Sequence, residues 1–108
     1  MLSLQAYGRI ASDIKIKNGR DNKHVYATFL LASHHNHQTT FIRCVAFDGT
    51  ANLLHEYFSC GDRIILRGEL ISDDYNNTKY VFKFKISEFE FVETLDNHNK
   101  NKTKNNTK

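Results

Sequence analysis

The stretch TTFIRCVAFDGTANLLHEYFSCGDRIILRGELI, residues 39–71, contains the pattern changes that decide the fold. Over residues 39–47 the sequence alternates with a period of two, which predicts a β-strand. One face of this strand carries Phe41, Arg43, Val45 and Phe47, and the other carries Ile42, Cys44 and Ala46. Only the first face combines aromatic rings with a cation. Two interpretations of that face stay open: an ordinary buried barrel surface, or a solvated surface that contacts a partner.

The spacing of apolar residues changes directly after this strand and predicts one helix over residues 50–59. Asp48 or Thr50 is available as its N-cap, and Gly61 as the residue that stops it. The apolar stripe of this helix consists of Ala51, Leu54, Tyr57 and Phe58.

The remaining strands are predicted on either side of this segment. Residues 25–32 form a nearly continuous apolar and β-prone run, which is typical of a strand covered on both faces. Residues 62–71 are broken at Gly68, where a bulge or a barrel bend is expected, and a phase change near Ser87-Glu88 predicts a second bulge. Further strand patterns occupy residues 4–10, 13–17 and 80–91, and polar turns or loops occupy 18–19, 33–38 and 73–77. About five strands with one helix between the third and fourth predict an all-β OB-fold, a partly open Greek-key barrel.

Composition limits the classes of protein that remain. A chain of 108 residues with 40% hydrophobic and 25% charged residues suits one globular domain. Residues 97–108 contain four lysines, no acid and no apolar side chain, so we expect a disordered tail beyond a domain at residues 1–96. The total charge of +3 then leaves −1 for that domain, and any case for an anionic partner depends on local charge placement. The longest apolar run is too short for a membrane helix and the start lacks a secretory pattern, which predicts a cytoplasmic location.

Metal and enzyme chemistry find little support in the sequence. Cys44 and Cys60 fit neither a disulfide framework nor a paired thiolate site, and we expect both to be reduced. The loop cluster His34, His35 and His37 has no cysteine or carboxylate at a paired spacing, so cationic contact with an anionic partner is a better interpretation than metal binding. No phosphate loop or catalytic motif is present. We therefore expect no cofactor, no metal and no enzymatic activity.

Several short motifs together carry a family resemblance over residues 4–92. They are Gly8-Arg9-Ile10 with Asp13, residues 27–33, residues 40–47, Ala51, Glu56-Tyr57, Gly61-Asp62, residues 67–70 and Tyr75. In this combination the chain resembles the single-stranded DNA-binding (SSB) proteins of bacteria and phages. The resemblance implies coating of single-stranded DNA without sequence preference in replication, recombination or repair, usually by a homotetramer. A dimer is also compatible with the sequence.

The resemblance also implies particular contact residues. It places the base-stacking positions at Phe41, Phe47 and Tyr75, with a fourth near His37. Candidate phosphate contacts are Arg43, Lys17, Lys79, Lys83 and Lys85, with Arg9 a weaker one, and Tyr80 completes the candidate DNA-binding set. For Lys83 and Lys85 a solvated edge strand is an equally good interpretation.

The chain also departs from the family pattern. It has no tryptophan, it has Asp73-Asp74 before the flap residue Tyr75, and it lacks the acidic tip through which many relatives recruit replication proteins. Phage or mobile-element origin would agree with that missing tip. Two other functions therefore stay open: an SSB-like accessory protein that acts mainly through protein partners, and an RNA-binding OB domain.

Overall fold

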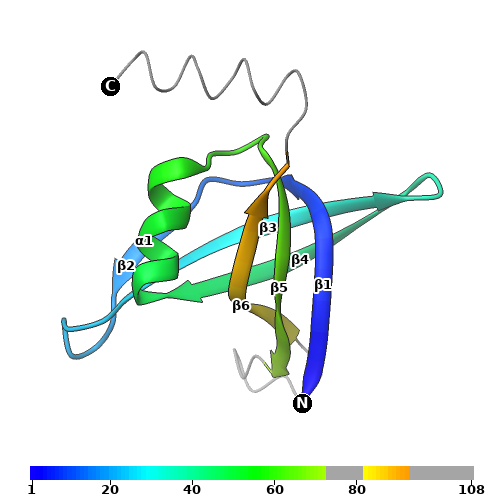
Figure 1. The fold of residues 1–108 in the computed structure, drawn as a ribbon. Coiled ribbons are helices and arrows are strands. Elements are labelled where there is room, and N and C mark those ends of the chain that lie inside the picture. Colours follow the sequence, from blue (N-terminus) through cyan, green and yellow to red (C-terminus); the bar gives the residue numbers. More distant parts are fainter. Residues whose placement is uncertain (73–81, 93–108) are drawn as a thin grey trace, which may run out of the picture.

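The computed structural model describes residues 1–72 and 82–92. In this part, six strands form one sheet in the order β1-β5-β6-β4-β3-β2, and a further pairing of β1 with β3 closes the sheet into a barrel (Figure 1). One helix, α1, lies beside β3 and β4. The elements are β1 Leu2–Ile10, β2 Lys15–Asn18, β3 Val25–His35, β4 Gln38–Phe47, α1 Asp48–Tyr57, β5 Arg63–Ser72 and β6 Phe82–Phe91. The predicted OB-fold is thus confirmed. Six strands are described where about five were predicted, because β2 is a separate short strand, so the helix follows the fourth strand and not the third.

The core follows from the alternation of the strands. One face of each long strand points into the barrel, and α1 adds Ala51 and Leu54, both fully buried. Burying these apolar side chains supplies the main driving force for folding. The largest fully buried side chains are Phe84, Ile10, Leu31, Leu54, Ile64, Leu66 and Cys44.

The predicted boundaries of the helix were wrong by two residues at each end. The N-cap is Phe47, with no side-chain cap hydrogen bond, so neither Asp48 nor Thr50 caps the helix. The helix ends at Tyr57 with Phe58 as its C-cap, and Gly61 lies in the following turn with φ of 98°. That turn is closed by the buried carboxylate of Asp62, which accepts a hydrogen bond from the Ser59 N–H at 2.8 Å.

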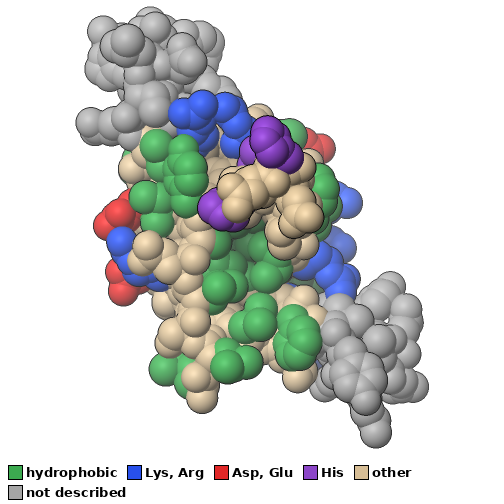
Figure 2. All heavy atoms as spheres, turned by 90° about the vertical axis from the view of Figure 1, so that its right-hand side faces the viewer, with side chains coloured by type: hydrophobic (Ala, Val, Ile, Leu, Met, Phe, Trp, Pro, Cys, Tyr) green, Lys and Arg blue, Asp and Glu red, His purple; other side chains and the backbone are tan. Residues whose placement is uncertain are grey.

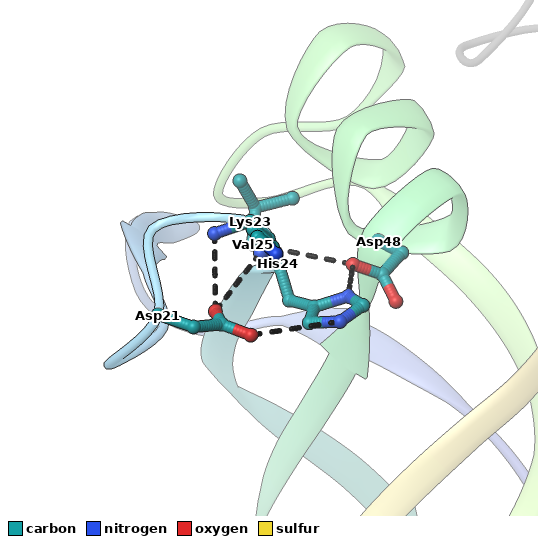
Figure 3. A network of polar contacts seen from close by, with 5 residues as sticks. All are labelled: Asp21, Lys23, His24, Val25 and Asp48. Carbon is teal, nitrogen blue, oxygen red and sulfur yellow. Dashed lines mark hydrogen bonds and ion pairs between the residues drawn. The ribbon is translucent and has the colours of Figure 1, made fainter.

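Asp48 instead joins the start of α1 to the turn between β2 and β3 (Figure 3). Its φ of 51° is left-handed, which is costly for a residue other than glycine. The carboxylate lies 3.1 Å from Nδ1 of His24 and accepts a hydrogen bond from the Val25 N–H at 3.3 Å. Asp21 approaches the other ring nitrogen of His24 at 3.7 Å. These contacts offset the strain at Asp48.

The two carboxylates give this turn a pH dependence. The pKa of His24 is raised from its ordinary 6.5, first by the hydrogen bond to Asp48 and then by the charges of Asp48 and Asp21. A raised pKa in the folded state means that this stabilisation is complete below about pH 6.5 and is lost as the pH rises through the folded-state value. We expect the thermal midpoint of the wild type, relative to that of His24→Gln, to fall as pH rises from about 6 to 8. The shift is small because the ring is exposed.

Thermal unfolding by circular dichroism at several pH values checks this expectation. His55→Gln, which removes an exposed histidine from α1, controls for the loss of one imidazole. Parallel pH profiles for the wild type and His24→Gln would show that the network contributes nothing.

The predicted bulge on the last strand is confirmed. Arg67 pairs with Glu88 but Gly68 pairs with Ile86, so Ser87 is the extra residue of β6. Its hydroxyl donates a hydrogen bond to the Arg67 carbonyl at 3.1 Å. The phase change that the sequence shows at this point is therefore a real change in which side chains face the core.

The predicted loop at residues 33–38 was too long. β3 continues to His35 and β4 begins at Gln38, so only Asn36 and His37 form the turn, with φ of 50° and 66°. Two successive left-handed residues are typical of a type I′ hairpin turn, which matches the twist of the flanking strands. The β3–β4 hairpin consequently projects beyond the barrel as a long arm (Figure 1).

Candidate nucleic-acid interface

The outward face of β4 is solvated at both of its phenylalanines. The ring of Phe41 is 61% exposed and that of Phe47 is 42% exposed, whereas the opposite face of the strand lies against the core through Ile42, Cys44 and Ala46. The interpretation of Phe41 and Phe47 as ordinary core residues was therefore wrong. Exposed aromatic rings beside a cation are the elements of a base-stacking surface.

A groove of about 830 Å³ runs over this outer face, across β2, β3 and β4. The strand registers put its lining side chains in rows. Lys17 pairs with Tyr26, and Tyr26 pairs with Phe47. The next rows are Lys15, Thr28 and Val45, and then Leu30 and Arg43. We call this the main groove.

The structure corrects the expectation that residues 25–32 are covered on both faces. Ala27, Phe29 and Leu31 are buried in the barrel, but Tyr26, Thr28 and Leu30 on the other face are only half-buried and line the main groove. The continuous apolar run concealed an alternation, because the outward positions hold large side chains that form the floor of a groove instead of contacting a second layer. Tyr26 is thus an aromatic groove residue that the sequence pattern did not reveal.

The main groove is basic. Four cations line it: Lys15, Lys17, Arg43 and Lys83. Asp13 is the one carboxylate among its lining residues within the described part of the chain. Although the domain as a whole is nearly neutral, its positive charge is concentrated where the aromatic side chains are. Such a local field favours an anionic chain.

Lys85 lies at the margin of the main groove. Its Nζ is 5.8 Å from the centre of the Phe47 ring and 4.0 Å from a carboxylate oxygen of Glu69. The register brings it there, since Val45 pairs with Lys85 and Lys85 with Glu69. The ammonium group is therefore shared between an aromatic face and an acid.

Three other predicted contact residues lie outside the main groove, and Phe41 is the one that shares the outer face of β4 with it. His37 is at the tip of the β3–β4 hairpin, and Figure 2 shows histidine side chains gathered around that tip with basic side chains on either side of the arm. Arg9, on β1, lines a second groove with a separate set of residues and donates a hydrogen bond to the Gly61 carbonyl at 3.2 Å. Of the predicted set, the main groove thus brings together Arg43, Phe47, Lys17 and Lys83.

Several predictions fall outside the described residues, among them the turn at residues 73–77 and the start of the last strand at residue 80. The others concern Tyr75, Lys79 and Tyr80 as contact residues and residues 97–108 as a disordered tail. They stay predictions.

The two cysteines do not form a metal-binding site among the described residues. Burial raises the pKa of the Cys44 thiol to about 12, so it stays protonated and unreactive at neutral pH. Cys60 is exposed, and both cysteines are free. Among residues 1–72 and 82–92, no group of three or more His, Cys, Asp and Glu side chains could hold a metal ion.

No helix in the same ranges is long and apolar enough to cross a membrane.

Comparison with known proteins agrees with this geometry. The fold resembles the SSB domain of a Synechococcus protein, with a TM-score of 0.72 and 13% identity over 83% of this chain and 94% of that one. The model of the single-strand binding protein family matches residues 1–92, so the chain belongs to that family. Its members are binding proteins and not enzymes, which confirms the prediction of a non-enzymatic protein.

Two bacterial relatives are similar in sequence as well. The single-stranded DNA-binding protein of Fusobacterium nucleatum is 38% identical over 65% of this chain, and the aligned part covers 51% of that protein. The protein of the same name from Staphylococcus epidermidis is 28% identical over 93% of this chain and 86% of its own length. The chain thus spans about half of the first relative and most of the second.

Proposed function

We propose that this protein binds and coats single-stranded DNA without sequence preference. The observation that supports this most directly is the main groove, in which Lys17, Tyr26 and Phe47 form one row and Arg43 lies two rows further along, with exposed Phe41 beyond it on the same face of β4. Membership of the single-strand binding protein family and the names of both relatives point to the same ligand.

The mechanism combines two sequence-independent interactions. Bases stack on aromatic faces, each worth about 1–3 kcal/mol, and every base presents such a face. Lysine and arginine neutralise phosphates, and each contact adds about −0.7 to the slope of log affinity against log salt for a single strand. The four cations lining the main groove therefore give a slope of roughly −3 if each contacts one phosphate.

The proposed assembly rests on membership of the family. We propose a homotetramer, in which several domains bind one DNA strand during replication, recombination or repair. Linking several such grooves raises the overall affinity through effective concentration even where each groove binds weakly. Light scattering measures the oligomeric state, and a monomer would contradict the proposal.

Fluorescence polarisation with labelled oligomers tests the proposed function. We expect tight binding to oligo-dT, similar affinity for other unstructured DNA sequences, and much weaker binding to duplex DNA, because duplex bases are already stacked. The series is run at several salt concentrations and includes an RNA of the same length. Tighter binding to the RNA would favour an RNA-binding domain, and weak binding to every oligomer would favour an accessory protein that acts through protein partners.

A further inference from the structure

A second groove of about 560 Å³ lies further along the same strands. On β4, Arg43 and Phe47 line the main groove and Thr39 lines the second one, with exposed Phe41 between them on the same face. On β3, Leu30 lines the main groove and Ala32 the second. The two grooves are therefore consecutive along one strand pair. From residue 47 to residue 39 of β4 the distance is about 27 Å, since a strand rises about 3.4 Å per residue.

The strand registers bring two arginines into the row of Phe41. Phe41 pairs with Ala32 of β3, Ala32 pairs with Arg9 of β1, and Arg9 pairs with Arg63 of β5. Neighbouring strands are about 4.8 Å apart, so Arg9 lies roughly 10 Å across the sheet from Phe41. The side chain between them is the methyl group of Ala32, which is too small to separate Phe41 from Arg9, so the surface is hollowed at that point.

The charge of this groove is unbalanced. None of its lining residues is acidic, and within residues 1–72 and 82–92 no carboxylate lies within 4.0 Å of Arg9 or Arg63. Like charges directly opposite on neighbouring strands destabilise a sheet. Two rows further along the same face of β5 the situation differs, because Arg67 is 3.2 Å from Glu90 and 3.9 Å from Glu88. A bound anion would relieve the repulsion between Arg9 and Arg63.

The side chains around the two arginines are suited to a nucleotide chain. The Gly61 carbonyl holds one guanidinium nitrogen of Arg9 at 3.2 Å, which orients the planar group. Tyr7, two residues earlier on the same face of β1, is 51% exposed and lines the groove. On the hairpin side, His34 and Thr39 are joined at 2.8 Å. The groove therefore combines a basic pair with an exposed aromatic ring.

We propose that this second groove binds the phosphodiester backbone of the same DNA strand after it passes Phe41, with Arg9 and Arg63 as the phosphate contacts. The proposal rests on the proposed function. It extends the DNA path from β4 across β3 to β1 and β5, and it adds Arg63 and Tyr7 to the interface.

Salt-dependent binding tests the proposal with oligo-dT of two lengths, about 5 and about 15 nucleotides, which fall near the limits of what one OB domain occupies. For Arg9→Gln with Arg63→Gln we expect the salt slope on the longer oligomer to become shallower by about 1.4, since two phosphate contacts are lost. The slope on the shorter oligomer stays at the wild-type value, because the main groove alone holds it. The matched control is Arg20→Gln with Lys23→Gln, which removes the same charge from the exposed turn between β2 and β3, outside both grooves.

A second variant guards against a structural effect of losing the Arg9 bond to Gly61. Arg63→Gln alone leaves that bond intact and is expected to change the slope on the longer oligomer by about 0.7. The second groove is not a DNA-binding site if the salt slope is unchanged both in Arg63→Gln and in Arg9→Gln with Arg63→Gln. The same conclusion follows if the control pair changes the slope equally. In either case the proposed function stands. Failure of the wild type to bind any single-stranded oligomer overturns both.

Discussion

Replacing Phe41 and Phe47 together with leucine is expected to weaken binding of oligo-dT by about 2–6 kcal/mol, which is roughly 30-fold or more. Both rings are exposed on one face of β4, so each offers a stacking surface for one base. Leucine keeps an apolar side chain on the strand but has no aromatic face. The folded state should change little, since neither ring belongs to the buried core. Fluorescence polarisation measures the loss.

The matched control is the double variant Phe82→Leu with Phe91→Leu. These two phenylalanines, on β6, are 46% and 50% exposed and lie outside the main groove. The control therefore removes the same number of exposed rings by the same substitution. Equal affinities for the two double variants would show that stacking on β4 does not carry binding, and the search would then move to protein partners. Circular dichroism confirms that both variants are folded.

The resemblance to the SSB family placed stacking positions at Phe41 and Phe47, and the strict alternation of β4, with a cation between the two rings, agreed with it. The same logic did not reveal Tyr26, since β3 has apolar side chains at nearly every position and so lacks a polar face. Hydrophobicity alone cannot distinguish a residue covered by a second layer from one that forms the floor of a groove. Pairing distinguishes them: once Tyr26 is opposite Phe47, it must share the outer face.

Arg63 was missed for a different reason. Nothing near it in the sequence indicates a site, and its relation to Phe41 runs through three strand pairings that join β5, β1, β3 and β4. Barrel closure through β1 and β3 creates that relation. The OB-fold could be predicted from the order of its elements. The row from Arg63 to Phe41 depends on which residues pair across three strand boundaries, and the alternation within one strand shows which face a residue occupies but not its partner on the next strand.

Gly68 was predicted correctly as the place of a bulge or bend. Of the described residues, it gives the substitution for which we expect a large loss of stability. Gly68 of β5 faces β6 next to the extra residue Ser87. A Cβ there would overlap the Lys85 carbonyl oxygen, lie 2.9 Å from the carbonyl carbon and lie 3.0 Å from the ring of Phe84. Phe84 is fully buried, so the ring cannot move aside into solvent. Two strands therefore approach each other more closely than any side chain allows.

Gly68→Ala is expected to destabilise the protein by about 3 kcal/mol, at the upper end of overpacking effects, and to lower the thermal midpoint by roughly 10–20 °C. Gly49→Ala is the matched control, because a Cβ at Gly49 in α1 meets nothing within 4 Å. Alanine in place of a helical glycine should stabilise by about 0.5–1 kcal/mol, so the two variants are expected to shift the midpoint in opposite directions. Denaturant and thermal unfolding measure both.

If Gly68→Ala unfolds at the wild-type midpoint, β5 and β6 can separate at the bulge without loss of stability, and their close approach does not hold the barrel together. If it is destabilised as expected, the close approach of β5 and β6 at Gly68 is needed for stability, and β6 is the strand that carries Lys83, which lines the main groove, and Lys85, which lies over Phe47.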